Sequence, residues 1–204
     1  MASAISVESI EPLEKGKVRI VFDNGTVVVL YRKEVAGLKL QEGLFLSKEQ
    51  YDKILYEIIG KRAKKRAMYL LEQMDRSERK LREKLTQNQY PEECVDFAID
   101  YVKKYHYLDD YRYACTYVRY HGEKLSKVQL LQKLLQKGIT KDVAQKAIEE
   151  EAQADEIALI RQWIQKKGYS LDSADEKETR RMYAFLLRRG FKSSDICKEL
   201  HNML

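Results

Sequence analysis

Apolar residues recur in sets of five, and the spacing within the set is kept at three places along the chain. The second set begins 49 residues after the first (81 to 130), and the third begins 52 residues after the second (130 to 182). A period of this length is typical of tandem small units, none of which buries its apolar face alone. The fifteen positions are Leu81, Leu85, Tyr90, Val95, Ile99, Leu130, Leu134, Ile139, Ala144, Ile148, Met182, Leu186, Phe191, Ile196 and Leu200.

Helical periodicity and end signals predict three helices in each unit. An apolar stripe at i, i+4, i+7, i+8 and i+11 predicts the first helix of the first unit. The stripe consists of Ala63, Ala67, Leu70, Leu71 and Met74. Ser77 and Ser126 occupy matching N-cap positions, Pro91 is placed to open a third helix, and Gly138 and Gly190 are helix stops.

The N-terminal segment has a different pattern, which predicts strands followed by a helix. Asn24-Gly25 separates two runs rich in valine and isoleucine, and this pair favours the tight turn of a β-hairpin. Ile5, Val7 and Ile10 supply a third strand. Ser47 and Gln50 form a capping box before a helix that we expect to end near Gly60.

The sequence therefore predicts a mainly α protein, an elongated array of three tandem three-helix repeats preceded by a small β-hairpin-containing module. The expected divisions are 1–60 for the N-terminal β module plus helix, 61–108 for repeat 1, 109–154 for repeat 2 and 155–204 for repeat 3. Arrays of this kind make long binding surfaces more often than enclosed catalytic pockets.

Basic residues are concentrated after residue 60. The chain carries 38 basic and 32 acidic residues, a net charge of +6, yet residues 1–60 have a net charge of −1 and residues 61–108 a net charge of +4. Such clusters favour phosphate oxygens or acidic protein surfaces, although a solvated helix face has the same composition. The candidate binding residues are Lys61, Arg62, Lys64, Lys65, Arg66, Arg112, Arg119, Lys127, Lys133, Arg180, Arg181, Arg188 and Arg189.

Seven of the 14 tyrosines lie between Tyr101 and Tyr120, with arginines among them. Aromatic rings beside arginines suit base stacking and protein interfaces alike. Tyr113 and Tyr117 are spaced to pack between the first two repeats, so a structural role is favoured for them. Asp109 and Asp110 are interpreted as helix-capping residues rather than as a catalytic pair.

No catalytic, metal or cofactor motif is apparent. The three cysteines and three histidines are scattered, and no glycine-rich phosphate loop, nucleophile elbow or zinc signature is present. We therefore expect a non-enzymatic protein with reduced thiols. No apolar run reaches the roughly 18 residues of a membrane span, and no secretory signal is visible, so we expect a cytoplasmic protein.

Two segments resemble a known family. Residues 107–119 (YLDDYRYACTYVR) and residues 134–139 (LLQKGI), together with the triplicated three-helix pattern, resemble the RecX family of bacterial recombinase regulators. The resemblance covers residues 61–204 and implies a modulator of the RecA recombinase that lies along the groove of the RecA–single-stranded DNA filament. It implies inhibition of filament extension, ATP hydrolysis, strand exchange and coprotease activity, and so a role in DNA repair, homologous recombination and the SOS response. We expect a monomer that contacts no membrane.

Two other hypotheses stay open. The three-helix units are also compatible with direct DNA binding through the basic patches, which a steep loss of affinity with salt would identify. A helical scaffold for some other protein partner is the third possibility.

Overall fold

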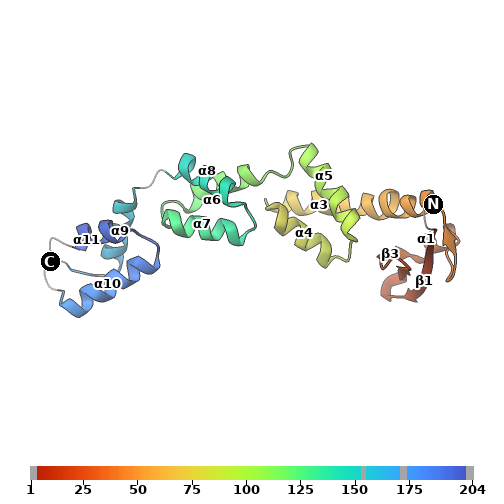
Figure 1. The fold of residues 1–204 in the computed structure, drawn as a ribbon, viewed down its shortest axis with the longest axis horizontal. Coiled ribbons are helices and arrows are strands. Elements are labelled where there is room, and N and C mark those ends of the chain that lie inside the picture. Colours follow the sequence, from red (N-terminus) through yellow and green to blue (C-terminus); the bar gives the residue numbers. More distant parts are fainter. Residues whose placement is uncertain (1–3, 153–154, 171–173, 201–204) are drawn as a thin grey trace. The chain divides into compact units, whose positions relative to one another are not determined.

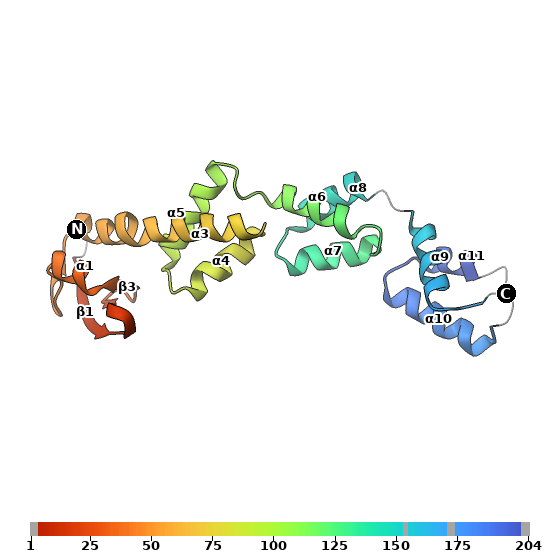
Figure 2. The same cartoon turned by 180° about the vertical axis from the view of Figure 1, so that it is seen from behind.

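The computed structural model describes residues 4–152, 155–170 and 174–200. The chain divides into two compact units, Met1–Asp109 and Asp110–Leu204, each of which is described by itself. The first unit holds the strands together with several helices, and the second is helical (Figures 1 and 2). The protein is mainly α with a small N-terminal strand module, as the sequence predicts.

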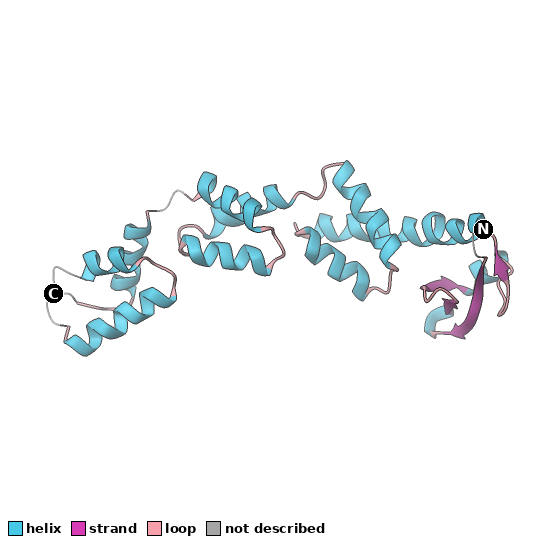
Figure 3. Ribbon diagram, in the orientation of Figure 1, coloured by secondary structure: helices cyan, strands magenta, loops and turns pink. Residues whose placement is uncertain are grey.

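A four-stranded antiparallel sheet forms most of the N-terminal module (Figure 3). The strands are β1 (Ile5–Pro12), β2 (Lys17–Phe22), β3 (Val27–Tyr31) and β4 (Phe45–Leu46), in the order β3-β2-β1-β4. β2 and β3 form the predicted hairpin, and Gly25 adopts a φ of 81° in its turn, a conformation that glycine allows without a steric cost. A 3-10 turn, η1 (Glu14–Gly16), and a short helix, α1 (Arg32–Gly37), complete the module.

One continuous helical segment connects the sheet to the first three-helix bundle. It consists of α2 (Lys48–Asp52), the π-helical η2 (Lys53–Gly60) and α3 (Lys61–Gln73), and it begins at the predicted Ser47–Gln50 capping box. The expectation that this helix ends at Gly60 was wrong. Gly60 keeps helical backbone angles, and a Cβ at this position would lie 2.7 Å from Phe97 Cδ1, so the glycine allows two helices to approach closely.

The β module and the first bundle share one hydrophobic core. Ile20, Phe22 and Leu30 of the sheet are wholly buried, as are Ile54 and Leu55 of the connecting helix, and all belong to one cluster that continues to Leu108. The remaining helices of this unit are α4 (Glu78–Gln87) and α5 (Glu92–Lys104). Burial of this apolar surface is the main term that stabilises the unit.

The second unit contains two further three-helix bundles. The first is α6 (Asp110–His121), α7 (Lys127–Gln136) and α8 (Lys141–Glu151); the second is α9 (Glu156–Lys166), α10 (Glu176–Arg188) and α11 (Ser193–Leu200). Each bundle has its own buried cluster. Residues 171–173, between α9 and α10, lie outside the described residues.

The repeated apolar positions form the centres of the three bundles. Fourteen of the fifteen are no more than 7% exposed, and the remaining one, Tyr90, is half-buried. The predicted caps also hold: Ser77 and Ser126 accept hydrogen bonds from the amides of Lys80 and Gln129. Met74 departs from the pattern, because it ends α3 in an extended conformation and is 58% exposed.

Tyr113 and Tyr117 pack against the core of the α6–α8 bundle. Both tyrosines therefore have a structural role in the bundle to which their own helix, α6, belongs, and their packing between the first two repeats stays a prediction. The glycines expected to stop α7 and α10 do so with left-handed backbone angles, φ 90° at Gly138 and 81° at Gly190.

Within the second unit, the start of α7 meets the end of α10. The Ser126 hydroxyl donates to the carbonyl oxygen of Arg189 at 2.5 Å, and a Cβ on Gly190 would lie 2.6 Å from Val128 Cβ. Ser126 therefore caps its own helix and also binds the third bundle, and its side chain is wholly buried there.

We expect Leu134→Ala to reduce the free energy of unfolding of the α6–α8 bundle by about 2–5 kcal/mol, because it leaves a cavity in a fully buried site. Leu135→Ala is the matched control, since Leu135 is 39% exposed and adjacent. Native-state hydrogen exchange of the α7 amides measures both effects. Equal losses for the two variants would contradict the assigned core.

We expect Gly190→Ala to destabilise the third bundle by about 1–3 kcal/mol, because alanine is strained at this φ and its Cβ meets Val128. Urea unfolding followed by the fluorescence of Trp163, the chain's single tryptophan, reports on this bundle. Gly37→Ala is the control, because that site has open space and no left-handed φ, and its stability should be unchanged or slightly higher. An unchanged Gly190→Ala protein would contradict the close approach.

Candidate functional site

The cations of α3 separate into an exposed pair and three that contact other side chains. Lys61 and Lys65 are exposed, one turn apart, and line a shallow hollow with Lys64, Met68 and Tyr101. Positions four residues apart lie on one helix face, so the two ammonium groups present a single cationic surface. This is the part of the predicted basic run that solvent reaches most freely.

Arg62 is engaged inside the first unit. Its guanidinium forms an ion pair with Glu34, donates to the carbonyl oxygen of Val29 at 3.2 Å and lies 4.7 Å from the centre of the Tyr31 ring. Arg62 thus joins α3 to the sheet and α1. Because these partners hold the guanidinium inside the unit, Arg62 stabilises the fold and is not part of the candidate surface.

The ammonium group of Lys64 lies over two aromatic rings, and further tyrosines that are partly exposed lie next to them. Its ammonium nitrogen is 3.8 Å from the centre of the Phe97 ring and 4.6 Å from that of Tyr101. Tyr101 and Tyr105 have ring centres 4.8 Å apart, and Tyr105 and Tyr107 6.5 Å apart. Tyr105 and Tyr107 are about half exposed. Rings and cations arranged in this way can stack unpaired bases or bind an aromatic-rich protein surface.

Arg66 is half-buried against its own helix. Its guanidinium lies 5.3 Å from the centre of the Tyr69 ring, and its buried Nε has no hydrogen-bond partner among the described residues. The alkyl stem and Nε therefore belong to the packed part of the bundle. The contribution of Arg66 to a binding surface is limited to its outer nitrogen atoms.

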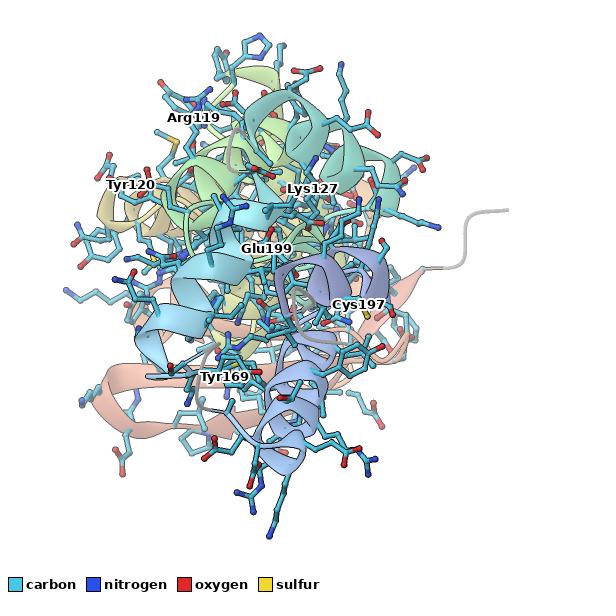
Figure 4. The ribbon with its side chains drawn as sticks, turned by 90° about the vertical axis from the view of Figure 1, so that its left-hand side faces the viewer. Arg119, Tyr120, Lys127, Tyr169, Cys197 and Glu199 are labelled. Atoms are coloured by element: carbon cyan, nitrogen blue, oxygen red, sulfur yellow. The ribbon has the colours of Figure 1, made fainter. Side chains whose placement is uncertain are left out.

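In the α6–α8 bundle, one predicted arginine is held by a carboxylate. Arg119 binds Glu151 through two hydrogen bonds of 2.6 Å, and this bidentate pair joins α6 to α8. α9 and α11 are joined in the same way by Arg161 and Glu199. Arg119 thus has a structural partner, whereas its neighbour Tyr120 is 79% exposed (both are labelled in Figure 4).

The other predicted cations of this bundle are exposed on α6 and α7. They are Arg112, Lys127 and Lys133. The carbonyl oxygen of Arg112 accepts a hydrogen bond from the Thr116 hydroxyl within α6. The amide of Lys127 donates to Glu156 at 3.0 Å, a contact that connects the two bundles of the second unit.

α10 carries a stripe of exposed cations. Lys177, Arg181 and Arg188 are exposed and surround Ala184, at the spacing i, i+4, i+7 and i+11. At 1.5 Å per residue the stripe spans about 16 Å. Arg180 lies at its side and forms an ion pair with Glu176. Lys177 is absent from the sequence prediction, although its helical spacing from Arg181 is visible in the sequence.

Arg189 is packed rather than free. Its guanidinium lies 3.7 Å from the centre of the Trp163 ring and 4.6 Å from that of Phe185, and its buried Nε has no partner among the described residues. Lys137, at the equivalent end of α7, lies over Tyr117 at 5.0 Å. Both cations cover aromatic residues of the first helix in their bundle, so they contribute to packing.

The described residues hold no group of three or more histidine, cysteine, aspartate or glutamate side chains placed to bind a metal ion. Burial, together with a smaller effect of the Glu93 carboxylate, raises the pKa of the Cys94 thiol to about 12, so this thiol is protonated at neutral pH. Within the same described ranges, no helix has the length and apolar content that crossing a bilayer requires.

Comparisons with known proteins agree with this architecture. Models of the RecX family match three segments: the first three-helix domain at residues 63–101, the second at 109–148 and the third at 154–200. The Regulatory protein RecX of Caldanaerobacter subterraneus subsp. tengcongensis is 30% identical over 80% of this chain and 82% of its own length. The chain belongs to the RecX family.

Other RecX proteins extend the comparison. The Regulatory protein RecX of Vibrio campbellii is 33% identical over 66% of this chain and 86% of its own length. A crystal structure of regulatory protein RecX has a TM-score of 0.64 at 23% identity and covers 97% of this chain and 99% of its own. RecX from Lactobacillus salivarius has a TM-score of 0.57 at 18% identity, covering 71% and 96%. The two structures support the fold, and the family name indicates a regulatory protein.

Glu78 connects α4 to α5 in this RecX-family chain. Its carboxylate accepts hydrogen bonds from Arg82 Nε and Lys103 Nζ, both at 2.9 Å. Burial raises the pKa of Glu78, but the hydrogen bonds from Lys103 and Arg82 outweigh it, so the pKa lies below its ordinary value. The unfolded chain then binds the proton more tightly than the folded one.

We therefore expect the Glu78 contribution to stability to be present above about pH 4.5 and lost as the pH falls through the lowered pKa. Glu78→Gln should flatten this part of the stability profile, because the amide does not titrate. Urea unfolding between about pH 3 and pH 7 measures the slope. Lys103→Gln, which removes one of the two donors, should give an intermediate slope; an unchanged slope in Glu78→Gln would contradict the assignment.

Proposed function

We propose that this chain binds the RecA–single-stranded DNA filament along its groove and restrains filament extension, ATP hydrolysis, strand exchange and coprotease activity. In this role it is a non-enzymatic regulator of DNA repair and the SOS response that acts in the cytoplasm. Membership of the RecX family is the observation that carries the proposal. The partner and the inhibitory effect follow from the family resemblance of residues 107–119 and 134–139.

Separate cationic surfaces in different bundles support a filament partner. The Lys61–Lys65 pair belongs to the first bundle, and the Lys177–Arg181–Arg188 stripe belongs to the third. A filament repeats the same surface many times, so several weak contacts on one chain gain affinity from effective concentration. Contacts that bridge protomers in one conformation shift the filament population toward that conformation.

A second candidate function, direct binding of single-stranded DNA, is favoured by the Lys64 aromatic contacts. A cation over Phe97 and Tyr101, followed by the partly exposed rings of Tyr105 and Tyr107, offers stacking surfaces beside the Lys61–Lys65 pair. Sequence-tolerant binders of single strands combine these two elements. The two functions are compatible, because a protein in the filament groove lies near the DNA.

We expect two charge-reversal pairs, Lys61→Glu with Lys65→Glu and Arg181→Glu with Arg188→Glu, each to raise the concentration needed for half-inhibition of the RecA ATPase about tenfold. Melting temperatures should change little, because these side chains are exposed. Lys48→Glu with Lys53→Glu is the matched control: two exposed lysines in the same unit as Lys61, whose reversal should leave inhibition within about twofold.

Full inhibition by both reversed pairs would overturn the cationic-surface proposal. Titration of a DNA oligonucleotide separates the two candidate functions. If the protein binds DNA directly, affinity should depend less steeply on salt when the charges of Lys61 and Lys65 are reversed. The negative slope of log affinity against log salt should become shallower by about 1.4, since each lost contact with a single strand contributes about 0.7. Lost inhibition without any affinity for the oligonucleotide identifies the protein surface of the filament as the contact.

A further inference from the structure

A cleft lies between the β2–β3 hairpin and the turn that joins α4 to α5, within the first unit. It consists of two adjoining hollows that share Leu13, Gln89 and Tyr90. β3 contributes Val27 and Val29 to its floor. None of the cationic surfaces described above belongs to this cleft, and the inference drawn from it is independent of the proposed function.

β3 is an edge strand, and its outward backbone groups face away from β2. Val29 shows the direction, because its carbonyl oxygen accepts a hydrogen bond from Arg62 instead of from β2. The amide of Tyr31 likewise donates to Glu34 at 2.8 Å. N–H and C=O of one strand residue point to the same side, and the side alternates along the strand. Val27 and Val29 therefore direct their amides to the outer edge, whereas Val28 and Leu30 pair with β2.

Two residues on the walls of the cleft adopt left-handed backbone conformations without being glycine. Lys15, in the β1–β2 loop, has a φ of 57°, and Gln89, in the α4–α5 turn, has a φ of 63°. Such conformations cost free energy and concentrate at functional sites. Here they border an open strand edge from two sides.

The charges of the cleft are divided between its ends. Lys15 and Lys17 lie with Glu14 at the end that holds Tyr31, and Glu92 and Glu93 lie at the end that holds Val27. The two arginines that also line the cleft are engaged inside the unit, because Arg62 forms an ion pair with Glu34 and Arg19 forms one with Glu11. A polyanion such as DNA would meet carboxylates at one end. An extended peptide with an acidic end and a basic end matches both.

We propose that this cleft binds an extended segment of a partner protein, which adds to β3 as a further strand. The main-chain groups of Val27 and the amide of Val29 bind the backbone of the segment, while the Val29 carbonyl oxygen keeps its hydrogen bond from Arg62. Lys15 and Lys17 bind the acidic end of the segment. Strand addition of this type draws affinity from main-chain hydrogen bonds and specificity from the flanking side chains. Arg62 and Glu34 bind the outward groups at one end of this edge, and the part that they leave open is otherwise a liability for a folded protein.

The test measures binding of the full chain to two peptides, Glu-Thr-Glu-Val-Thr-Val-Lys and the same residues in reverse order. Two peptides are needed because an added strand can run parallel or antiparallel to β3. We expect one of the two to bind and to slow hydrogen exchange at the Val27 and Val29 amides but not at Val28, which is already paired with β2. Binding of neither peptide, or protection elsewhere only, overturns the proposal.

Val29→Pro is the decisive variant. Proline removes the outward amide while leaving the ladder to β2, because an edge strand tolerates proline where the N–H faces away from the sheet. We expect peptide affinity to fall about tenfold or more. Val29→Thr keeps the amide and the β-branched shape and should bind within about twofold of the parent. Unaltered binding by Val29→Pro overturns the proposal even if the hydrogen-exchange pattern agrees.

Two further measurements distinguish other occupants. Protection of Val27 and Val29 by an oligothymidylate would overturn the proposal in favour of nucleic acid. A concentration-dependent dimer in sedimentation that Val29→Pro abolishes would replace the separate partner with a second copy of this chain. Lys15→Asn should weaken peptide binding without loss of stability, because asparagine tolerates the left-handed conformation better than lysine does.

Discussion

Burial of five apolar side chains per bundle is the constraint on which the structure depends. Each bundle contains only three short helices, so a helix that loses its partners has no stable isolated form. The repeated positions supply the contacts that hold the three helices together, and every other feature is built on the outside of these cores. The cationic surfaces are therefore side chains on rigid helices rather than on loops.

The sequence alone was enough to predict the features that depend on one helix or one turn. The apolar columns, the Ser77 and Ser126 caps, the hairpin at Gly25 and the stop at Gly190 depend on local spacing and backbone preference, and all are confirmed. Gly60 was misinterpreted because its role depends on Phe97, which lies 37 residues later (60 to 97). Met74 left its stripe because the helix ended there.

The candidate site could be predicted only in part, for the same reason. A sequence shows that Arg62, Arg119 and Arg189 are cations, but it does not show that Glu34, Glu151 and Trp163 meet them after folding. Lys61, Lys65, Arg181 and Arg188 remain exposed. The predicted basic run thus divides into cations that hold the fold together and cations that face solvent, and this division needs coordinates.

The unbroken helical segment from Lys48 to Gln73 has a consequence for how the first unit unfolds. Its first half is anchored in the sheet and its second half is the opening helix of the first bundle, with one apolar interior between them. No point along this segment allows the strand module to be removed or exchanged without exposing that interior. The strand module and the first bundle should therefore lose their structure together rather than one after the other.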